Sequence, residues 1–205
     1  MRANRERARI FAVGAIASVL CGATFASGAA ATPIWKLNGH TLEEPEATIG
    51  HALASSLAIP GVTTTCEPFV YKMTISGSTG SITKMPLSNC FTNKPVCTVS
   101  SIEAEKLPWA AKLVTVGASN YLVIEGFKLT IVFGGEECVL FETAVTITGS
   151  AGGLIDNASE SIAFSSSSFS ATGTSLKALG QSSTWTGTFT MLTTGFHIGE
   201  SLTVS

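Results

Sequence analysis

Residues 127–133 read FKLTIVF, and every second side chain in this run is large and apolar. Alternation of this kind places the apolar side chains on one face of a β-strand and Lys128 and Thr130 on the other. Residues 134–137 (GGEE) follow as a turn. The next run carries a matching apolar face, made by Val139, Phe141, Val145 and Ile147. The two runs predict a long β-hairpin with one buried face.

The same period of two recurs along most of the chain. It predicts strands at 69–75, 81–87, 96–105, 110–116 and 121–125. In 46–59, Ile49, Leu53 and Leu57 recur every fourth residue, which suits a helix, but the odd positions suit a strand broken at Ser55, which we favour. Trp185, Phe189 and Met191 alternate with threonines, and residues 193–195 (TTG) turn the chain into a return strand whose face is Phe196, Ile198, Leu202 and Val204. Residues 165–168 (SSSS) are expected to form an exposed strand or loop. The pattern predicts an all-β fold, an antiparallel β-sandwich or barrel.

The N-terminus has the order of a secretory signal peptide. All four arginines lie in the first nine residues, an apolar run covers 10–20, and small residues fill 22–31. Cleavage after Ala26, Ala30 or Ala31 fits, and the rival interpretation is an uncleaved membrane anchor. We expect a signal peptide at 1–31, a single β-rich domain at 32–205, no transmembrane segment after cleavage, and a location outside the cell or in its envelope.

Charge limits the partners of the mature chain. Residues 32–205 hold eight lysines, no arginine and thirteen acids, of which only Asp156 is an aspartate, so the formal net charge is −5. Phosphate backbones and anionic membrane surfaces are bound by clusters of Lys and Arg. We therefore expect neither nucleic acid nor an anionic membrane surface as a partner.

Four cysteines remain after cleavage, an even number that suggests two disulfides in an exported chain. Cys90 and Cys97 are close in sequence with Pro95 between them, which favours Cys90–Cys97 together with Cys66–Cys138. The alternative follows from hairpin register. A turn centred on Ser78 would place Cys66 opposite Cys90 and leave Cys97 to pair with Cys138.

No motif for catalysis or metal binding is present. The histidines, His40, His51 and His197, lack the spacing of a zinc site, there is no G-x-S-x-G elbow, and the cysteines lack paired spacing. Glu103 and Glu105 share a strand face and are the best pair for a glycoside hydrolase. We expect no catalytic residues, no metal and no cofactor.

Exposed aromatic rings are the common feature of sugar-binding β-domains. Trp109 follows Pro108 in a bend, and Trp35 lies near the mature N-terminus, so these two rings are the candidates for a carbohydrate-binding face. An apolar cavity inside a barrel, suited to a lipid, is a further possibility. Asn157-Ala158-Ser159 matches the sequon for N-glycosylation.

The cysteines sit in a recognisable order: Thr65-Cys66, Ser88-Asn89-Cys90, Val96-Cys97-Thr98 and Glu137-Cys138, with Leu107-Pro108-Trp109 and Val145-Thr146-Ile147-Thr148-Gly149. Over residues 61–153 the chain resembles small secreted β-rich proteins of high-GC Gram-positive soil bacteria that have no assigned activity. The resemblance implies a disulfide-bearing exported domain and carries no catalytic residues.

The sequence thus predicts a secreted or envelope-associated, non-enzymatic β-rich protein that binds a ligand or has a structural role. Its partner would be an envelope polysaccharide or an envelope protein. The alternatives are a carbohydrate-binding module that uses Trp109 and Trp35, and a Glu-dependent glycoside hydrolase.

Overall fold

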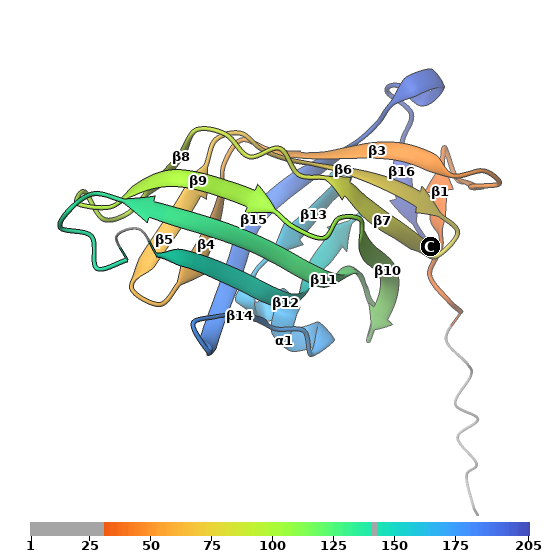
Figure 1. Cartoon of the computed structure of the whole chain (residues 1–205). Helices are drawn as coiled ribbons and strands as arrows, with labels where there is room; N and C mark the ends of the chain where they lie inside the picture. Colours follow the sequence, from red (N-terminus) through yellow and green to blue (C-terminus); the bar gives the residue numbers. More distant parts are fainter. Residues whose placement is uncertain (1–30, 141–142) are drawn as a thin grey trace, which may run out of the picture.

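The computed structural model describes residues 31–140 and 143–205, so the expected signal peptide lies outside the described residues except for Ala31. The prediction of an all-β antiparallel fold is confirmed, and of the two architectures the chain adopts the barrel (Figure 1). Eight strands form the closed ring, in which each strand pairs with the next and β13 pairs with β15. In ring order they are β3 (Glu46–Ala52), β6 (Phe69–Ser76), β7 (Thr79–Lys84), β10 (Trp109–Val116), β11 (Ser119–Gly134), β12 (Ala144–Asp156), β13 (Ser161–Phe164) and β15 (Gln181–Thr193).

Three of these strands, β11, β12 and β15, run on past the ring and support further strands. β9 (Thr98–Ala104) pairs with β11, and β14 (Leu176–Ala178) lies between β12 and β15. On the other side of β15 follow β4 (Ser55–Ile59), β5 (Val62–Cys66) and β8 (Cys90–Thr92). The two outermost strands of this extension, β8 and β9, have no ladder between them.

Aromatic rings fill the ring of strands. Trp185 is fully buried, stacks on Phe164 with 4.0 Å between ring centroids, and contacts further rings of the core, namely Phe69, Tyr71, Phe127 and Phe189. Its indole N–H donates to the Ser55 hydroxyl at 2.7 Å. An eight-stranded barrel is just wide enough for side chains to fill it. The lumen is therefore packed with side chains, and the apolar ligand cavity considered from the sequence does not lie there.

The long hairpin predicted from FKLTIVF is present, and its turn is longer than predicted. Phe127, Leu129, Ile131 and Phe133 are all buried, and Val145 and Ile147 lie opposite Ile131 and Leu129. Val139, predicted on the buried face, is instead 87% exposed, because β12 begins only at Ala144. Phe141 lies outside the described residues.

The region 46–59 forms two strands, as the break in its pattern predicts. In the first strand, however, the even-numbered residues are buried and not the odd-numbered ones. In β3 the buried residues are Thr48, Gly50 and Ala52, while Leu53 is 85% exposed. Gly50 faces Tyr71 across the ladder, and a Cβ at this position would lie 2.2 Å from the ring carbon Cζ. The Tyr71 ring occupies the space that a side chain at position 50 would need, so only glycine fits on the core face here.

The expectation of a strand or loop at 165–168 is wrong. Ser165 is the N-cap of a helix, α1 (Ser166–Thr172), and its side chain accepts a hydrogen bond from the Ser168 N–H. Gly173 ends the helix in the left-handed conformation, with φ 68°. A hydroxyl that caps the first turn and a glycine at the end are helix signals, and Phe169 provides the buried anchor.

The predicted return strand at the C-terminus is also corrected. Gly195–His197 forms a 3-10 turn, and the following strand, β16 (Leu202–Val204), pairs with β1 (Trp35–Leu37) and not with β15. β2 (His40–Thr41) completes this three-stranded sheet. The Trp35 N–H donates to the Gly77 carbonyl in the β6–β7 turn, which places the sheet at that end of the barrel (Figure 1).

Asn157, the sequon residue, holds β16 in place. Its amide nitrogen donates to the Val204 carbonyl at 2.7 Å, and its amide oxygen accepts from the Val204 N–H at 2.9 Å. We expect Asn157→Ala to lower the free energy of unfolding by about 1–3 kcal/mol and to speed amide exchange in β16, because two strand hydrogen bonds are lost. Asn157→Asp keeps the acceptor oxygen, so its free energy of unfolding should lie between those of Asn157→Ala and the wild type. Unchanged exchange in β16 of Asn157→Ala would contradict this role.

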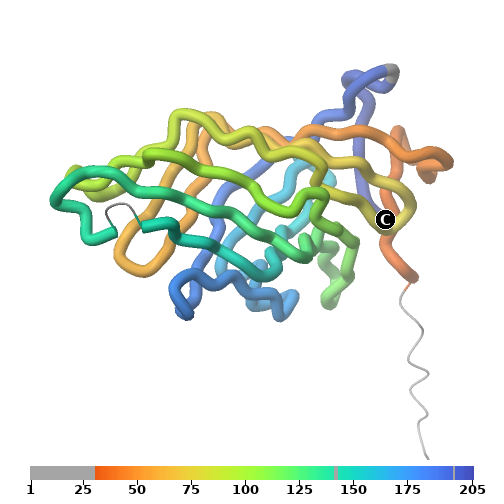
Figure 2. Tube along the Cα trace, in the orientation of Figure 1, coloured from red at the N-terminus to blue at the C-terminus, as the bar shows by residue number. Residues whose placement is uncertain are grey.

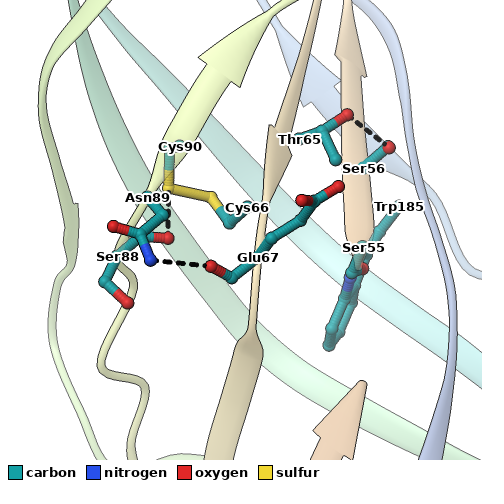
Figure 3. Close-up of a disulfide and its surroundings, with 9 residues drawn as sticks. All are labelled: Ser55, Ser56, Thr65, Cys66, Glu67, Ser88, Asn89, Cys90 and Trp185. Atoms are coloured by element: carbon teal, nitrogen blue, oxygen red, sulfur yellow. Dashed lines mark hydrogen bonds between the residues drawn. A yellow bond between two sulfur atoms is a disulfide. The ribbon is translucent and has the colours of Figure 1, made fainter. Parts of the chain in front are cut away.

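Both disulfides follow the alternative pairing, Cys66–Cys90 and Cys97–Cys138, so the favoured set, Cys90–Cys97 with Cys66–Cys138, is wrong. The β5–β8 register places Cys66 opposite Cys90 with 4.0 Å between Cα atoms (Figure 3). β9 pairs with the far end of β11, which brings Cys97 to 4.8 Å (Cα–Cα) from Cys138 in the β11–β12 connection. Strand register decides the pairing, and closeness in sequence does not.

Candidate binding site

Beyond the closed ring, the edges of the extension are not joined by strand pairing among the described residues. β7 and β10 pair from Thr79 to Ile82 and from Trp109 to Lys112, and beyond this ladder no strand pairing joins the chain segments 84–92 and 98–107. β8 has its partner in β5, and β9 has its partner in β11. We call the opening between segments 84–92 and 98–107 the seam. Figure 2 shows both segments running along the same side of the molecule.

The apolar core reaches solvent along the seam. Most of the half-buried apolar residues that pack against the core lie here: Leu87, Cys90, Val99, Ile102, Ala104 and Leu107. In the closed ring, a neighbouring strand covers each inward-facing side chain. Along β8 and β9 that neighbour is missing on one side, so the inward-facing residues stay accessible.

A cavity of about 490 Å³ occupies the middle of the seam. Its apolar wall is formed by Met85, Pro86, Leu87, Ile102, Ala104 and Leu107, and the charged residues around it are Lys72, Lys84 and Glu103. Two smaller hollows of about 320 and 300 Å³ continue along β8 and β9 towards Cys97. This cavity is open to solvent, and its volume and its mainly apolar lining with a few charged groups fall within the range of small-molecule sites.

The charged groups at the cavity are unevenly distributed. Lys72 and Lys84 lie directly opposite each other in the β6–β7 ladder, and Glu103 stands on β9, across the seam. The ion pairs between described residues are Lys112–Glu125, Lys128–Glu105 and two contacts of His197, so none of them includes Lys72 or Lys84. Two lysines that have no carboxylate partner within residues 31–140 and 143–205 therefore border an apolar cavity.

Trp109 is not a binding residue at the surface, contrary to the expectation from its bend. The ring is 2% exposed, packs on Phe127 with 4.6 Å between centroids, and donates its N–H to the Glu105 carbonyl at 2.8 Å. Trp109 alternates with Ala111 and Leu113, both buried, on the inward face of β10. The period-two pattern, followed through Trp109, is the signal that places this ring in the core.

Trp35 is also buried, with 1% of its surface exposed. It sits in β1 opposite Val204 of β16, and its indole N–H has no hydrogen-bond partner among the described residues. Since neither ring reaches solvent, the carbohydrate-binding face proposed for Trp109 and Trp35 is wrong.

The carboxylate pair expected on one strand face is divided between two environments. Glu103 borders the seam, whereas Glu105 lies beyond the end of β9 and binds Lys128 at 2.5 Å and the Thr130 hydroxyl. Hydrogen bonds from Lys128 and then from Thr130 lower the pKa of the Glu105 carboxyl. The general acid of a glycosidase must be protonated and therefore needs a raised pKa, whereas the environment of Glu105 favours the ionised carboxylate.

Acid is expected to destabilise the protein through such carboxylates. The pKa of Glu105 and that of Asp156, which accepts from Ser159 and the Ala158 N–H, are both lowered from ordinary values of 4.5 and 3.8. A carboxyl with a lowered folded pKa contributes stability above its unfolded pKa and loses it as pH falls through the folded value. The free energy of unfolding, measured in urea, should therefore fall below about pH 4.5, the ordinary value for Glu105.

A matched pair of variants tests the assignment. Glu105→Gln removes the carboxylate and should flatten the acid limb of the stability curve, whereas Glu44→Gln, at an exposed position, should leave the limb as in the wild type. Parallel acid limbs in Glu105→Gln and wild type would contradict the role of Glu105.

The histidines do not converge on a nucleophile among the described residues. His197 Nδ1 lies 3.2 Å from Glu200, and its Nε2 lies 4.0 Å from Glu46. His40 borders the same hollow as His197 at the end of the barrel, and His51 lies on β3 opposite Val70. Within the described ranges, no three His, Cys, Asp or Glu residues lie close enough together to hold a metal ion.

Of the residues around the cavity, the sequence singled out Glu103 but not the two lysines or the apolar wall. Lys72 and Lys84 become neighbours only through a register shift in the β6–β7 ladder between Lys72 and Met73, which no local pattern indicates. One signal was present on β9: the alternation breaks at Ser100-Ser101, where the β9–β11 ladder also shifts register. Such irregularities are frequent next to functional sites.

In the described part of the chain, no helix is long and apolar enough to cross a membrane. Comparison of the chain with protein-family models, with curated proteins and with solved structures found no match in any of the three. The seam, with its cavity and its two lysines, therefore stands as the candidate site on its own geometry.

Proposed function

We propose that this protein is an exported, non-enzymatic binding protein whose ligand is a small, mainly apolar molecule held in the seam. The observation that carries the proposal is the cavity of about 490 Å³ where half-buried core residues line the unpaired edges of the extension. Two disulfides support export, since such bonds persist in oxidising compartments. The order of charged, apolar and small residues in 1–31 supports it as well.

The chemistry of the cavity wall supports an apolar ligand over a sugar. Six of its nine lining residues are apolar, and none of them is aromatic. Sugar sites usually present an aromatic ring to the sugar face. A hydrocarbon ligand that displaces water from Met85, Leu87, Ile102 and Leu107 gains roughly 25 cal/mol per Å² of buried apolar surface. The binding energy would come mainly from this burial.

The wall also supports selectivity for a small molecule over another protein strand. Segment 84–92 contains Pro86, Asn89 has a positive φ of 48°, and β8 has only three residues. Prolines, irregular backbone and short length are features by which edge strands avoid pairing with other chains. The β8 edge of the seam is therefore a poor template for strand addition, while the cavity beside it is accessible.

A matched pair of tryptophan variants tests the proposal. Ala104 lines the cavity, and Ala110 lies exposed on the outer face of β10. The neutral apolar dye N-phenyl-1-naphthylamine should increase in fluorescence on addition of mature wild-type protein and of Ala110→Trp, but not on addition of Ala104→Trp, because the indole fills the cavity. Far-ultraviolet circular dichroism and the urea midpoint show that both variants fold.

Two outcomes would overturn the proposal. One is absence of dye binding by the wild-type protein. The other is equal binding by folded Ala104→Trp, which would place the dye elsewhere on the molecule.

A further inference from the structure

The polar end of the ligand can be inferred as well, on the basis of the proposed function. We infer that the seam binds an amphiphile with a single anionic head group, and that Lys72 and Lys84 together hold that group. The apolar part of the molecule lies against Leu87, Ile102 and Leu107, and the head group lies at the outer rim.

The two lysines form a like-charge pair in the ladder. Lys72 and Lys84 are cross-strand partners beside a register shift in the ladder, and both side chains are exposed at the rim of the cavity. Like charges in this position destabilise a sheet. An anion between the two ammonium groups converts this repulsion into two charge-assisted hydrogen bonds.

Two other lysines on the barrel wall each form an ion pair with a glutamate. Lys112 has Glu125 at 2.5 Å, and Lys128 has Glu105 at 2.5 Å. The lysines at the cavity lack such a partner among the described residues, although they are the ones placed opposite each other. The arrangement leaves an anion site open beside the apolar cavity.

Glu103 sets the charge of the ligand. It is the acidic residue at the cavity and stands on β9, across the seam from the two lysines. The three charged side chains sum to one positive charge, which a monoanion neutralises. A dianion would leave an excess negative charge facing Glu103, so a carboxylate head group fits better than a doubly charged phosphate.

The test compares two ligands that differ only in head group. Decanoate, below its micelle concentration, and the neutral decanol each compete with N-phenyl-1-naphthylamine for the mature protein at low salt and pH 7. We expect decanoate to bind at least about tenfold more tightly than decanol, because hydrogen bonds to charged groups are the stronger class. Decyl phosphate, largely dianionic at this pH, should bind more weakly than decanoate.

Matched variants assign the preference to the two lysines. Lys72→Met with Lys84→Met keeps the aliphatic stems and removes both charges, so the preference for decanoate over decanol should vanish while decanol binds as before. Lys112→Met, on the outer wall and outside the cavity, should keep the wild-type preference. These results together support the inference.

The possible failures are distinguishable. Equal binding of decanoate and decanol by the wild type, or a preference that survives in the double variant, would overturn the head-group inference and leave the seam as an apolar site. Failure of both ligands and of the dye to bind would overturn the proposed function as well.

Discussion

Trp185→Ala is expected to lower the free energy of unfolding by about 3–5 kcal/mol, the cost of removing a fully buried aromatic ring. The ring is fully buried and contacts five other aromatic rings, from 4.0 Å to Phe164 to 6.5 Å to Tyr71. Alanine would leave a large cavity at the axis of the barrel, where strands from every side are held by hydrogen-bonded ladders and cannot close in. Urea unfolding followed by circular dichroism measures the change.

Two control variants separate ring packing from other effects. Trp185→Phe keeps an aromatic ring in the core but loses part of the buried ring surface and the hydrogen bond to Ser55, so its cost should be well below that of alanine. Thr186→Ala, the exposed next residue of β15, should cost less than about 1 kcal/mol. A cost under 2 kcal/mol for Trp185→Ala, on the scale of large-to-small core substitutions, would contradict the packed lumen.

Removal of the Cys97–Cys138 disulfide should lower the free energy of unfolding by about 4 kcal/mol. The bond spans 41 residues, and the chain-entropy relation for a loop of this length gives about that value. The same relation gives about 3.5 kcal/mol for Cys66–Cys90, which spans 24 residues. Double alanine variants of each pair, compared in urea without reductant, measure both losses.

The pairing itself has a direct check. Proteolysis without reduction, followed by mass spectrometry, should yield peptides that join Cys66 to Cys90 and Cys97 to Cys138. A peptide joining Cys66 to Cys138 would contradict the β5–β8 register on which the extension of the barrel depends.

Period-two alternation was sufficient to predict the barrel strands wherever one face is uniformly apolar. FKLTIVF is the clearest example, because Phe127, Leu129, Ile131 and Phe133 are all buried, while Lys128, Thr130 and Val132 between them are half-buried. The pattern failed where a residue of another type occupies the core face. Gly50 and Thr48 are buried in β3 because Tyr71 and the neighbouring strand fill the space beside them, which only the ladder reveals.

Pairing between distant segments was the second limit. Leu202 and Val204 show a strand pattern, but nothing local indicates that their partner is β1, more than 160 residues earlier in the chain. The disulfide choice failed for the same reason. The N-cap Ser165 and the terminal Gly173 of α1 were readable signals, obscured by a run of serines that favours no single structure.

The candidate site was the least predictable part of the molecule. The seam exists because two strands do not pair, and an absent ladder leaves no trace in the alternation of either strand. Lys72 and Lys84 are twelve positions apart and meet through an irregular register. The tryptophans, chosen as typical binding residues, are buried because their positions continue the inward parity of β1 and β10.

The most direct test of the seam as a binding site is a methyl NMR titration of residues 32–205 with decanoate. The methyl resonances of Leu87, Ile102 and Leu107, which line the cavity, should shift in a saturable manner. Those of Leu57 and Ile131, buried in the barrel, should stay in place. Shifts confined to the lumen, or no saturable shift at the seam, would contradict the account.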